Sequence, residues 1–212
     1  MATVYYIGDS TVTYNRIDSW PQQGMSNALG LYLKEGITLS PHGRNGRSTK
    51  SFLDEGAFEA VKQKMQPGDF LLIQFGHNDE KDDPLRHTEP QTSYKENLSF
   101  FIRCAREKGA YPVLITSIAR RLFDEAGNFR PGSHGPYPEA VRKLGRELDV
   151  PVADLTTITE AYLAQVGDNP SKGWFMWPKD NTHLKPEGAM IMASFLAKEL
   201  RRFGPPYSDI LI

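Results

Sequence analysis

Short apolar segments alternate with longer helical segments along this chain, and this alternation limits the possible folds more than any other feature. The segments predicted as strands are Thr3–Ile7, Gly36–Leu39, Phe70–Phe75, Tyr111–Thr116 and Val150–Ala153. Several of them are apolar almost throughout, which is typical of parallel strands buried on both faces. We therefore expect an α/β protein in which a five-stranded parallel sheet lies between two helical layers, in a flavodoxin-like arrangement.

Helical periodicity fills most of the sequence between these strands. The predicted helices are Trp20–Lys34, Ser51–Met65, Gln91–Lys108, Pro138–Leu148, Thr156–Gln165 and Pro186–Arg202. The last of them opens with proline, which suits a first helical turn. Because no repeat, low-complexity tract or shift in composition divides the 212 residues, we expect one domain over residues 1–212.

The charge balance argues against several classes of partner. Lys and Arg number 25 and Asp and Glu number 26, so the net charge of −1 gives no general attraction to nucleic acid or to an anionic membrane. The chain has no apolar run of about 18 residues, and its first residues do not resemble a signal peptide. Cys104, the single cysteine, cannot form an intramolecular disulfide and is predicted to be buried. We expect a soluble, cytoplasmic protein, and the sequence predicts no particular oligomeric state.

Three connections are long for a compact α/β domain: Gly76–Pro90, Ser117–Pro136 and Gly167–Lys185. In a parallel sheet, long loops beyond the carboxyl ends of the strands commonly carry function. Tolerated surface insertions are the alternative interpretation. The motifs in and near these loops decide between the two.

Ser10 lies in the segment Gly8-Asp9-Ser10-Thr11, directly after the first predicted strand. A serine hydroxyl there can project from the edge of the sheet as a nucleophile, although Asp and Ser are also common turn and helix-capping residues. Nucleophilic attack at neutral pH requires a base that takes the hydroxyl proton.

Among the five histidines, His183 is the one with an obvious orienting group. The segment Asp180-Asn181-Thr182-His183 places a carboxylate three residues before the imidazole, in the last long loop. Asp180 can accept a hydrogen bond from one ring nitrogen while the other faces outward. The chain order Ser, Asp, His occurs in hydrolase triads, but the Gly-x-Ser-x-Gly motif of ordinary α/β-hydrolases is absent from the sequence.

Two further loops could supply hydrogen-bond donors for the oxyanion that forms during acyl transfer. Asn45-Gly46-Arg47-Ser48 follows the second strand, and its glycine allows the backbone to approach a ligand closely. Gly76-His77-Asn78-Asp79 follows the third strand and offers the side-chain amide of Asn78. Each segment alone is a common turn, but a doubly wound sheet would bring all of them to one edge.

These four segments resemble the four conserved blocks of the SGNH, or GDSL-type, hydrolases, and they occur in the family order over almost the whole chain. The resemblance implies that Ser10 is the nucleophile, His183 the base and Asp180 its orienting residue. It also implies an oxyanion hole formed by the amides of Ser10 and Gly46 and by Asn78.

Details of the blocks resemble one branch of that family, the bacterial rhamnogalacturonan acetylesterases. These details are Gly-Asp-Ser-Thr in the first block, the segment Gly46–Phe52, and Gly-His-Asn-Asp followed by a long charged loop. The resemblance implies a serine esterase that removes acetyl groups from pectin-derived oligosaccharides without a metal or organic cofactor. Secreted members of the branch carry a signal peptide, so we expect an intracellular enzyme acting on imported fragments.

Galacturonate makes pectin fragments anionic, which directs attention to basic and aromatic residues in the loops. The residues expected to contact the sugar are Asp9, Arg47, His87 and Trp177. Arg86 and Lys179 are further candidates for the carboxylates, and Trp174 could stack on a sugar or belong to the core. The charge pair Arg120-Arg121 is predicted to be a solvated surface.

Other functions use the same residue patterns. A lysophospholipase, thioesterase or arylesterase of this family would share the triad and prefer other acyl groups. A non-catalytic flavodoxin-like binding domain would share the sheet, but the sequence has no Gly-rich phosphate loop. A metal site built from His77, Asp79, His87 and His183 is disfavoured because no recognised ligand spacing is present.

Overall fold

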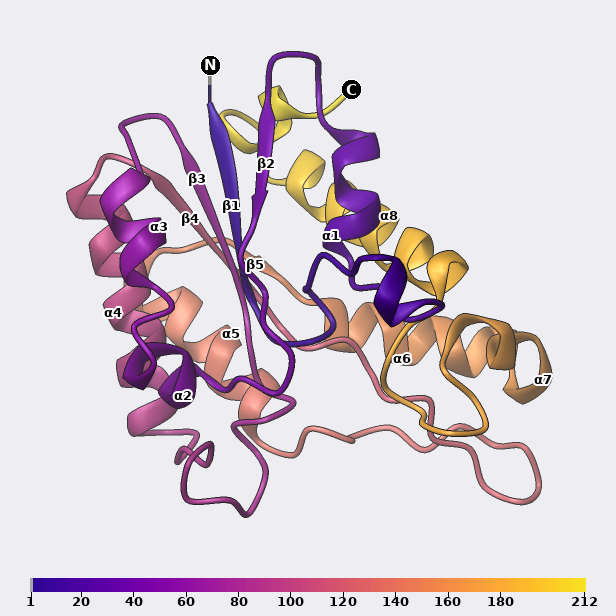
Figure 1. Ribbon diagram of the computed structural model, residues 1–212. Coiled ribbons are helices and arrows are strands. Elements are labelled where there is room, and N and C mark those ends of the chain that lie inside the picture. Colours follow the sequence, from indigo (N-terminus) through magenta and orange to yellow (C-terminus); the bar gives the residue numbers. More distant parts are fainter. Residues whose placement is uncertain (1) are drawn as a thin grey trace.

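A computed structural model describes residues 2–212 and contains one five-stranded sheet whose strand pairs are all parallel. The strands are β1 (Thr3–Gly8), β2 (Thr38–Pro41), β3 (Phe70–Gln74), β4 (Tyr111–Ile115) and β5 (Val152–Ala153). Their spatial order is β2-β1-β3-β4-β5, so β1 and β3 lie at the centre (Figure 1). The predicted α/β class and the five parallel strands are confirmed.

Helices cover both faces of the sheet. The α-helices are α1 (Ser26–Leu29), α2 (Thr49–Asp54), α3 (Glu59–Lys64), α4 (Ser93–Glu107), α5 (Tyr137–Leu148), α6 (Leu155–Val166), α7 (Asp168–Ser171) and α8 (Pro186–Arg202). Figure 1 shows α2, α3, α4 and α5 on one face, with α1, α6 and α8 on the other. Two apolar cores result, because successive side chains of β1 point alternately into each: Tyr6 into the α8 side, and Ile7 into the α4 side.

The centre of the sheet brings two functional loops together. Gly8 at the end of β1 pairs with Gln74 at the end of β3. The chain therefore leaves the sheet at the same level in both strands, with Ser10 two residues beyond one and Asn78 four residues beyond the other. This placement is the one expected for sites at the carboxyl edge of a parallel sheet.

The predicted helix Trp20–Lys34 is mostly wrong. Only Ser26–Leu29 is α-helical, followed by a 3-10 turn at Gly30–Tyr32, while a separate 3-10 turn covers Ile17–Ser19. Before α1, backbone groups bond to distant segments instead of to a helix: Gln23 N–H donates to Leu184 O and Gly24 N–H to Asn15 Oδ1, each at 2.9 Å. Tertiary hydrogen bonds thus override the apolar periodicity of this segment.

The predicted helix Ser51–Met65 is two helices, α2 and α3. The break lies at Gly56, whose φ of +66° leaves the helical region. A reciprocal capping box between Ser48 and Ser51 starts α2 two residues earlier than predicted. Smaller differences occur at β2, which starts at Thr38, and in the loop Gly167–Lys185, which contains α7 and a 3-10 turn at Lys172–Trp174.

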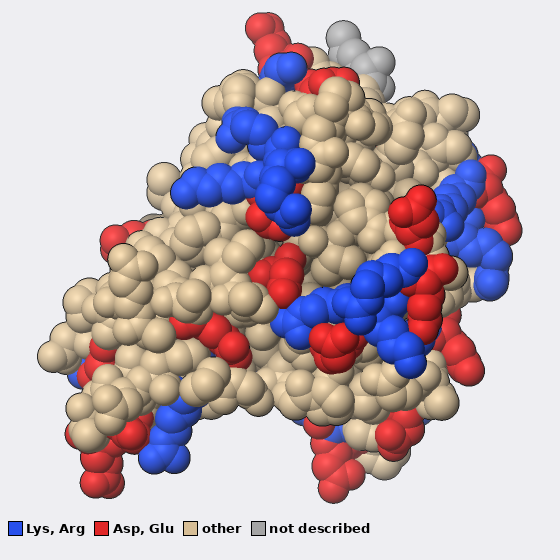
Figure 2. Space-filling model, turned by 180° about the vertical axis from the view of Figure 1, so that it is seen from behind, with Lys and Arg blue, Asp and Glu red and all other residues tan. Residues whose placement is uncertain are grey.

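Surface charges of both signs are mixed. On the face drawn in Figure 2, basic and acidic side chains lie together in small groups, and uncharged surface separates one group from the next. Within residues 2–212, the helices are all too short or too polar to cross a lipid bilayer. Cys104 is buried, as predicted.

Candidate active site

Ser10 lies in a tight turn directly beyond β1. The carbonyl of Asp9 accepts hydrogen bonds from the amides of Val12 and Thr13, which closes the turn around the serine. Gly8 is required before it, because a Cβ at this position would lie 2.4 Å from the carbonyl oxygen of Gln74. The turn leaves Ser10 only 7% exposed.

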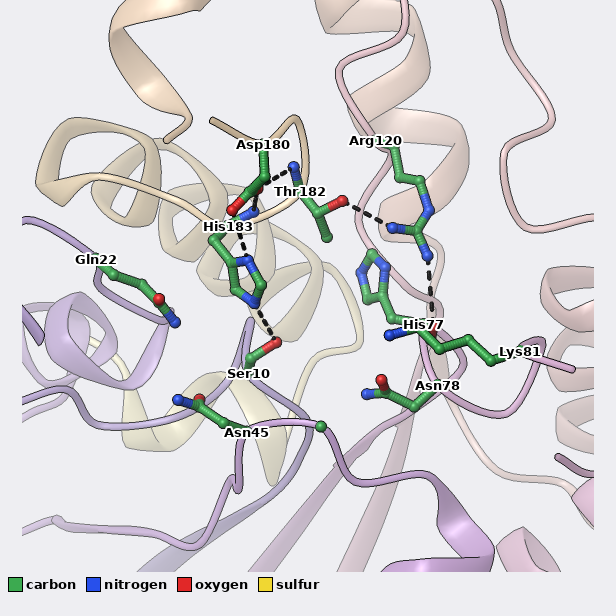
Figure 3. Close-up of a pocket in the computed structure, with 11 residues that line it drawn as sticks. Ser10, Gln22, Asn45, His77, Asn78, Lys81, Arg120, Asp180, Thr182 and His183 are labelled. Atoms are coloured by element: carbon green, nitrogen blue, oxygen red, sulfur yellow. Dashed lines mark hydrogen bonds and ion pairs between the residues drawn. The ribbon is translucent and has the colours of Figure 1, made fainter. Parts of the chain in front are cut away.

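The loop before α8 brings His183 and Asp180 to this serine. His183 Nε2 lies 2.9 Å from Ser10 Oγ, and His183 Nδ1 lies 2.9 Å from Asp180 Oδ2 (Figure 3). The other carboxylate oxygen of Asp180 accepts the amides of Thr182 and His183, at 2.8 and 2.7 Å. The three residues predicted as a catalytic triad therefore meet in hydrogen-bond contact.

The environment of Asp180 keeps its carboxyl group ionised. Burial acts to raise its pKa, but the amide donors of His183 and Thr182 and the bond from the imidazole outweigh burial, and the pKa lies below its usual value. An ionised Asp180 accepts a hydrogen bond from the Nδ1–H of His183, which leaves Nε2 with a lone pair toward Ser10. The arrangement suits proton transfer from the serine hydroxyl.

Gly46 and Asn78 face Ser10 from the neighbouring loops. Gly46 has a φ of +76°, a left-handed conformation that favours glycine. The side-chain amide of Asn78 donates to Arg47 O at 3.1 Å, so the two loops also hold each other in place. Both residues border the same cavity as Ser10.

Asp79 fixes the base of these loops and was not recognised as such from the sequence. Its carboxylate accepts the Thr49 hydroxyl at 2.6 Å, the Thr49 amide at 3.0 Å and the Thr88 hydroxyl at 3.0 Å. Burial raises the pKa of Asp79 to about 7, because it outweighs these donors. Asp79 thereby joins the loop after β3 to the start of α2. The sequence did carry a signal for this role, because the carboxylate of Asp79 directly follows Asn78, which was predicted to stabilise the oxyanion.

A cavity of about 440 Å³ opens beside Ser10. Polar and charged side chains, with one glycine, make up its lining: Ser10, Gln22, Asn45, Gly46, His77, Asn78, Lys81, Arg120, Asp180, Thr182 and His183. Figure 3 shows Gln22 and His77 on opposite sides of His183. Gln22, Lys81 and Arg120 were not predicted to belong to the site.

Asp9 was expected to contact substrate, but the structure gives it a different position. Its side chain is fully buried beneath the turn, where Oδ1 accepts the amide and the hydroxyl of Thr11 at 2.9 and 2.8 Å. Burial raises the pKa of its carboxyl group despite these donors. Asp9 is not part of the cavity lining and instead shapes the turn that carries Ser10.

The other residues predicted to bind the sugar also lie outside the cavity lining. Arg47 pairs with Glu55 at 3.0 Å and donates to Asn45 O, so its guanidinium is engaged outside the cavity lining. His87 contacts Lys81 O and Glu89. Trp177 is 42% exposed and stacks on Arg121, with the guanidinium carbon 4.6 Å from the ring centre. The remaining candidates are likewise outside: Arg86, Lys179 and Trp174.

The predicted solvated pair Arg120-Arg121 is wrong. Arg121 is 2% exposed and donates to Ser171 Oγ at 3.0 Å. Arg120 lines the cavity, where it donates to Thr182 Oγ1 at 2.7 Å and to Glu80 at 2.5 Å. Arg120 joins the loop after β4 to the triad loop and to the loop after β3, and Arg121 joins it to α7. Sequence pattern could not distinguish this from an exposed charge pair.

The disfavoured metal set His77, Asp79, His87 and His183 is not brought together. Within residues 2–212, a different trio has donor atoms within 4.8 Å of one another: His77, Glu80 and His134. Glu80 already pairs with the Arg120 guanidinium and with His134 Nδ1. Because an additional cation would be repelled by Arg120, this trio fits a divalent ion poorly.

Comparison with known proteins shows to which family this chain belongs. Residues 6–191 match the model of the GDSL-like lipase/acylhydrolase family. The chain belongs to this family. The resemblance drawn from the four sequence blocks is confirmed, and this GDSL-like hydrolase is a serine esterase.

Two curated relatives of this GDSL-like hydrolase come from Bacillus subtilis (strain 168). Rhamnogalacturonan acetylesterase RhgT is 38% identical, over 99% of this chain and 94% of its own. The probable rhamnogalacturonan acetylesterase YesY is also 38% identical, over 99% of this chain and 97% of its own. The crystal structure of B. subtilis protein YxiM superposes with a TM-score of 0.85 and 28% identity, and covers 97% of this chain and 57% of the YxiM chain.

Proposed function

We propose that this GDSL-like hydrolase is a carbohydrate esterase that removes acetyl groups from pectin-derived, rhamnogalacturonan oligosaccharides through an acyl-enzyme. The contact that carries the proposal is Asp180–His183–Ser10, with 2.9 Å at each hydrogen bond between side chains. Two full-length relatives named as rhamnogalacturonan acetylesterases, one of them as probable, support the substrate class.

The first half of the reaction transfers the acetyl group to the enzyme. His183 Nε2 accepts the proton of Ser10 while Oγ attacks the ester carbonyl and forms a tetrahedral intermediate. The intermediate collapses when the same nitrogen returns the proton to the sugar oxygen, which leaves as an alcohol. Asp180 stabilises the imidazolium that exists between these steps.

The second half releases acetate. His183 accepts a proton from water, the resulting hydroxide equivalent attacks the acetyl carbonyl, and Ser10 leaves with the proton restored. In both halves the amides of Ser10 and Gly46 and the side chain of Asn78 stabilise the oxyanion. The cycle uses side chains, backbone amides and water, and we propose no metal or organic cofactor.

The cavity lining favours a short acyl group over a long one. None of its residues has a large aliphatic or aromatic hydrocarbon side chain. A long acyl chain would find little apolar surface there, whereas sugar hydroxyls would find many donors and acceptors. This observation favours an acetyl ester of a sugar over the substrates of a lysophospholipase or an acyl thioesterase.

The proposal includes action in the cytoplasm. The single cysteine, Cys104, is buried and cannot form an intramolecular disulfide, so folding does not depend on an oxidising compartment.

Acetate release tests the proposal. The substrates are acetylated rhamnogalacturonan fragments, acetylated xylo-oligosaccharides and p-nitrophenyl esters with two, four and eight acyl carbons. We expect the fragments and the acetyl ester to be hydrolysed, and Ser10→Ala to abolish hydrolysis with an unchanged circular dichroism spectrum. Equal activity of Ser10→Ala would refute the mechanism, and a preference for the eight-carbon ester would point to another class of esterase. A non-catalytic binding domain would release no acetate at all.

A further inference from the structure

One side of the cavity carries a cation without a counterion. Over residues 2–212, the cavity lining contains one lysine, Lys81, and one arginine, Arg120. Arg120 is held by Glu80, Thr182 and the His77 carbonyl. Lys81 has no ion pair within the described part of the chain, and Figure 3 shows its side chain between His77 and Asn78.

His77, beside Lys81, has unused hydrogen-bonding groups. The residue is 3% exposed and borders the cavity, yet both of its ring nitrogens lack a partner among residues 2–212. Burial lowers its pKa well below the usual value, and nearby His134 and Arg120 add to this, so the ring is neutral near pH 7. A neutral ring has one donor and one acceptor to offer a ligand. Leaving such groups without partners is costly, and a bound polar ligand would remove the cost.

The charges around His77 favour an anionic ligand. Two acidic groups act on Lys81: Asp9, which is fully buried beneath the turn, and Glu80, which is already paired with Arg120. Both ring nitrogens of His134 are engaged within the protein, with Glu80 Oε2 at 2.9 Å and Ile118 O at 2.8 Å, so His134 has no ring nitrogen left for a ligand. Because Arg120 is engaged with Glu80, Lys81 is the positive group that remains for a ligand in the cavity.

We propose that Lys81 and His77 form a carboxylate subsite, which binds the uronic acid unit of the substrate while the acetyl ester lies at Ser10. Lys81 forms an ion pair with the carboxylate, and His77 donates one hydrogen bond to it. This inference rests on the proposed function and adds the residues that distinguish acidic from neutral acetylated sugars. It replaces Arg47, Arg86, His87 and Lys179 in that role.

Binding to an inactive enzyme tests the subsite without turnover. Ser10→Ala protein is titrated by calorimetry with an acetylated oligosaccharide containing galacturonate and with the same oligosaccharide methyl-esterified at its carboxylates. We expect the acid to bind about tenfold more tightly, the size of one charge-assisted hydrogen bond. Adding Lys81→Met should remove this preference, and Lys81→Arg should retain most of it. Equal affinity for acid and methyl ester in Ser10→Ala would overturn the proposal.

Kinetics on otherwise unaltered enzyme provide the second test. The ratio of kcat/KM for the acid to that for the methyl ester should fall about tenfold in Lys81→Met, mainly through KM. Lys179→Met is the matched control, because it removes the same charge from the triad loop but from outside the cavity lining, and its ratio should equal that of the unaltered enzyme. An equal fall in Lys179→Met would indicate general electrostatic attraction and contradict the subsite.

The two proposals fail in distinguishable ways. If the unaltered enzyme releases no acetate from any sugar, the proposed function is wrong. If it releases acetate with the same kcat/KM from acid and methyl ester, the esterase assignment stands and the subsite is wrong. Should Lys81→Met fold poorly, as judged by its Tm, Lys81→Gln replaces it in both measurements.

Discussion

His183 Nε2 lies 2.9 Å from Ser10 Oγ, although 173 positions separate the two residues in sequence. Backbone hydrogen bonds hold the histidine loop against two other segments: Gln23 N–H donates to Leu184 O at 2.9 Å, and Arg121 N–H to Asn181 O at 2.8 Å. The contact therefore depends on the segments before α1 and after β4 as well as on the residues that react. Such support is what a preorganised site requires.

Replacing Asp180 by asparagine should lower kcat by about three to four orders of magnitude, because an amide no longer stabilises the protonated ring or selects its tautomer. The backbone donors of Thr182 and His183 can still bond to the amide oxygen, so we expect a near-normal Tm. Steady-state acetate release measures the effect, with exposed Asp54→Asn as the control. An Asp180→Asn enzyme with more than a tenth of normal kcat would contradict the assigned role.

Truncating Asn78 to alanine should lower kcat about 10²–10³-fold with a smaller change in KM, because the lost donor acts mainly on the oxyanion. The variant also loses the bond to Arg47 O, so its Tm must be measured alongside. Asn169→Ala, at an exposed position of α7, should leave kcat and Tm unchanged. A change confined to KM would instead assign Asn78 to ground-state binding.

The raised pKa of Asp79, about 7, predicts a pH dependence of stability. Its unfolded-state pKa is near 3.8, so between about pH 4 and pH 7 the folded state binds more protons at this site than the unfolded state. The contribution of Asp79 to the free energy of unfolding must fall as pH rises through this window. Urea titrations at pH 5 and pH 7, compared between the unaltered protein and Asp79→Asn, isolate this contribution. If stability depends on pH in the same way in both proteins, the raised pKa of Asp79 is contradicted.

Gly8→Ala should destabilise the protein by about 1–3 kcal/mol, the usual cost of overpacking a tightly packed site. The new methyl group would lie 2.4 Å from Gln74 O and 2.6 Å from Val12 Cγ2, and the first of these is a backbone atom. Gly30→Ala is the control, because its Cβ would have one neighbour, at 4.0 Å. Urea unfolding compares the two, and equal midpoints would show that the turn before Ser10 can relax.

The sequence pattern was sufficient to predict the structure where the local composition and the fold agree. Strands β1, β3 and β4 are continuous apolar runs, and the triad residues stand in short motifs at loop positions that follow from the parallel sheet. Prediction from the sequence pattern failed where distant contacts decide the conformation. Gln23 and Gly24, for example, form hydrogen bonds to other segments instead of extending a helix. The direction of a charged side chain likewise cannot be predicted from its neighbours in sequence: Arg47 pairs with Glu55, whereas Lys81 lines the cavity.

The two arginines after β4 are adjacent in sequence but bind opposite neighbours. Arg120 reaches Glu80 and Thr182 beside the cavity, while Arg121 reaches Asp168 and Ser171 in α7. Removing one residue between β4 and this pair would place Arg121 where Arg120 lies and Arg120 where Ala119 lies, so neither arginine would keep its own partners. The spacing of this connection is therefore as strict a requirement as the identity of its residues, so that length variation among related enzymes should fall farther along the loop, around residues 124–128.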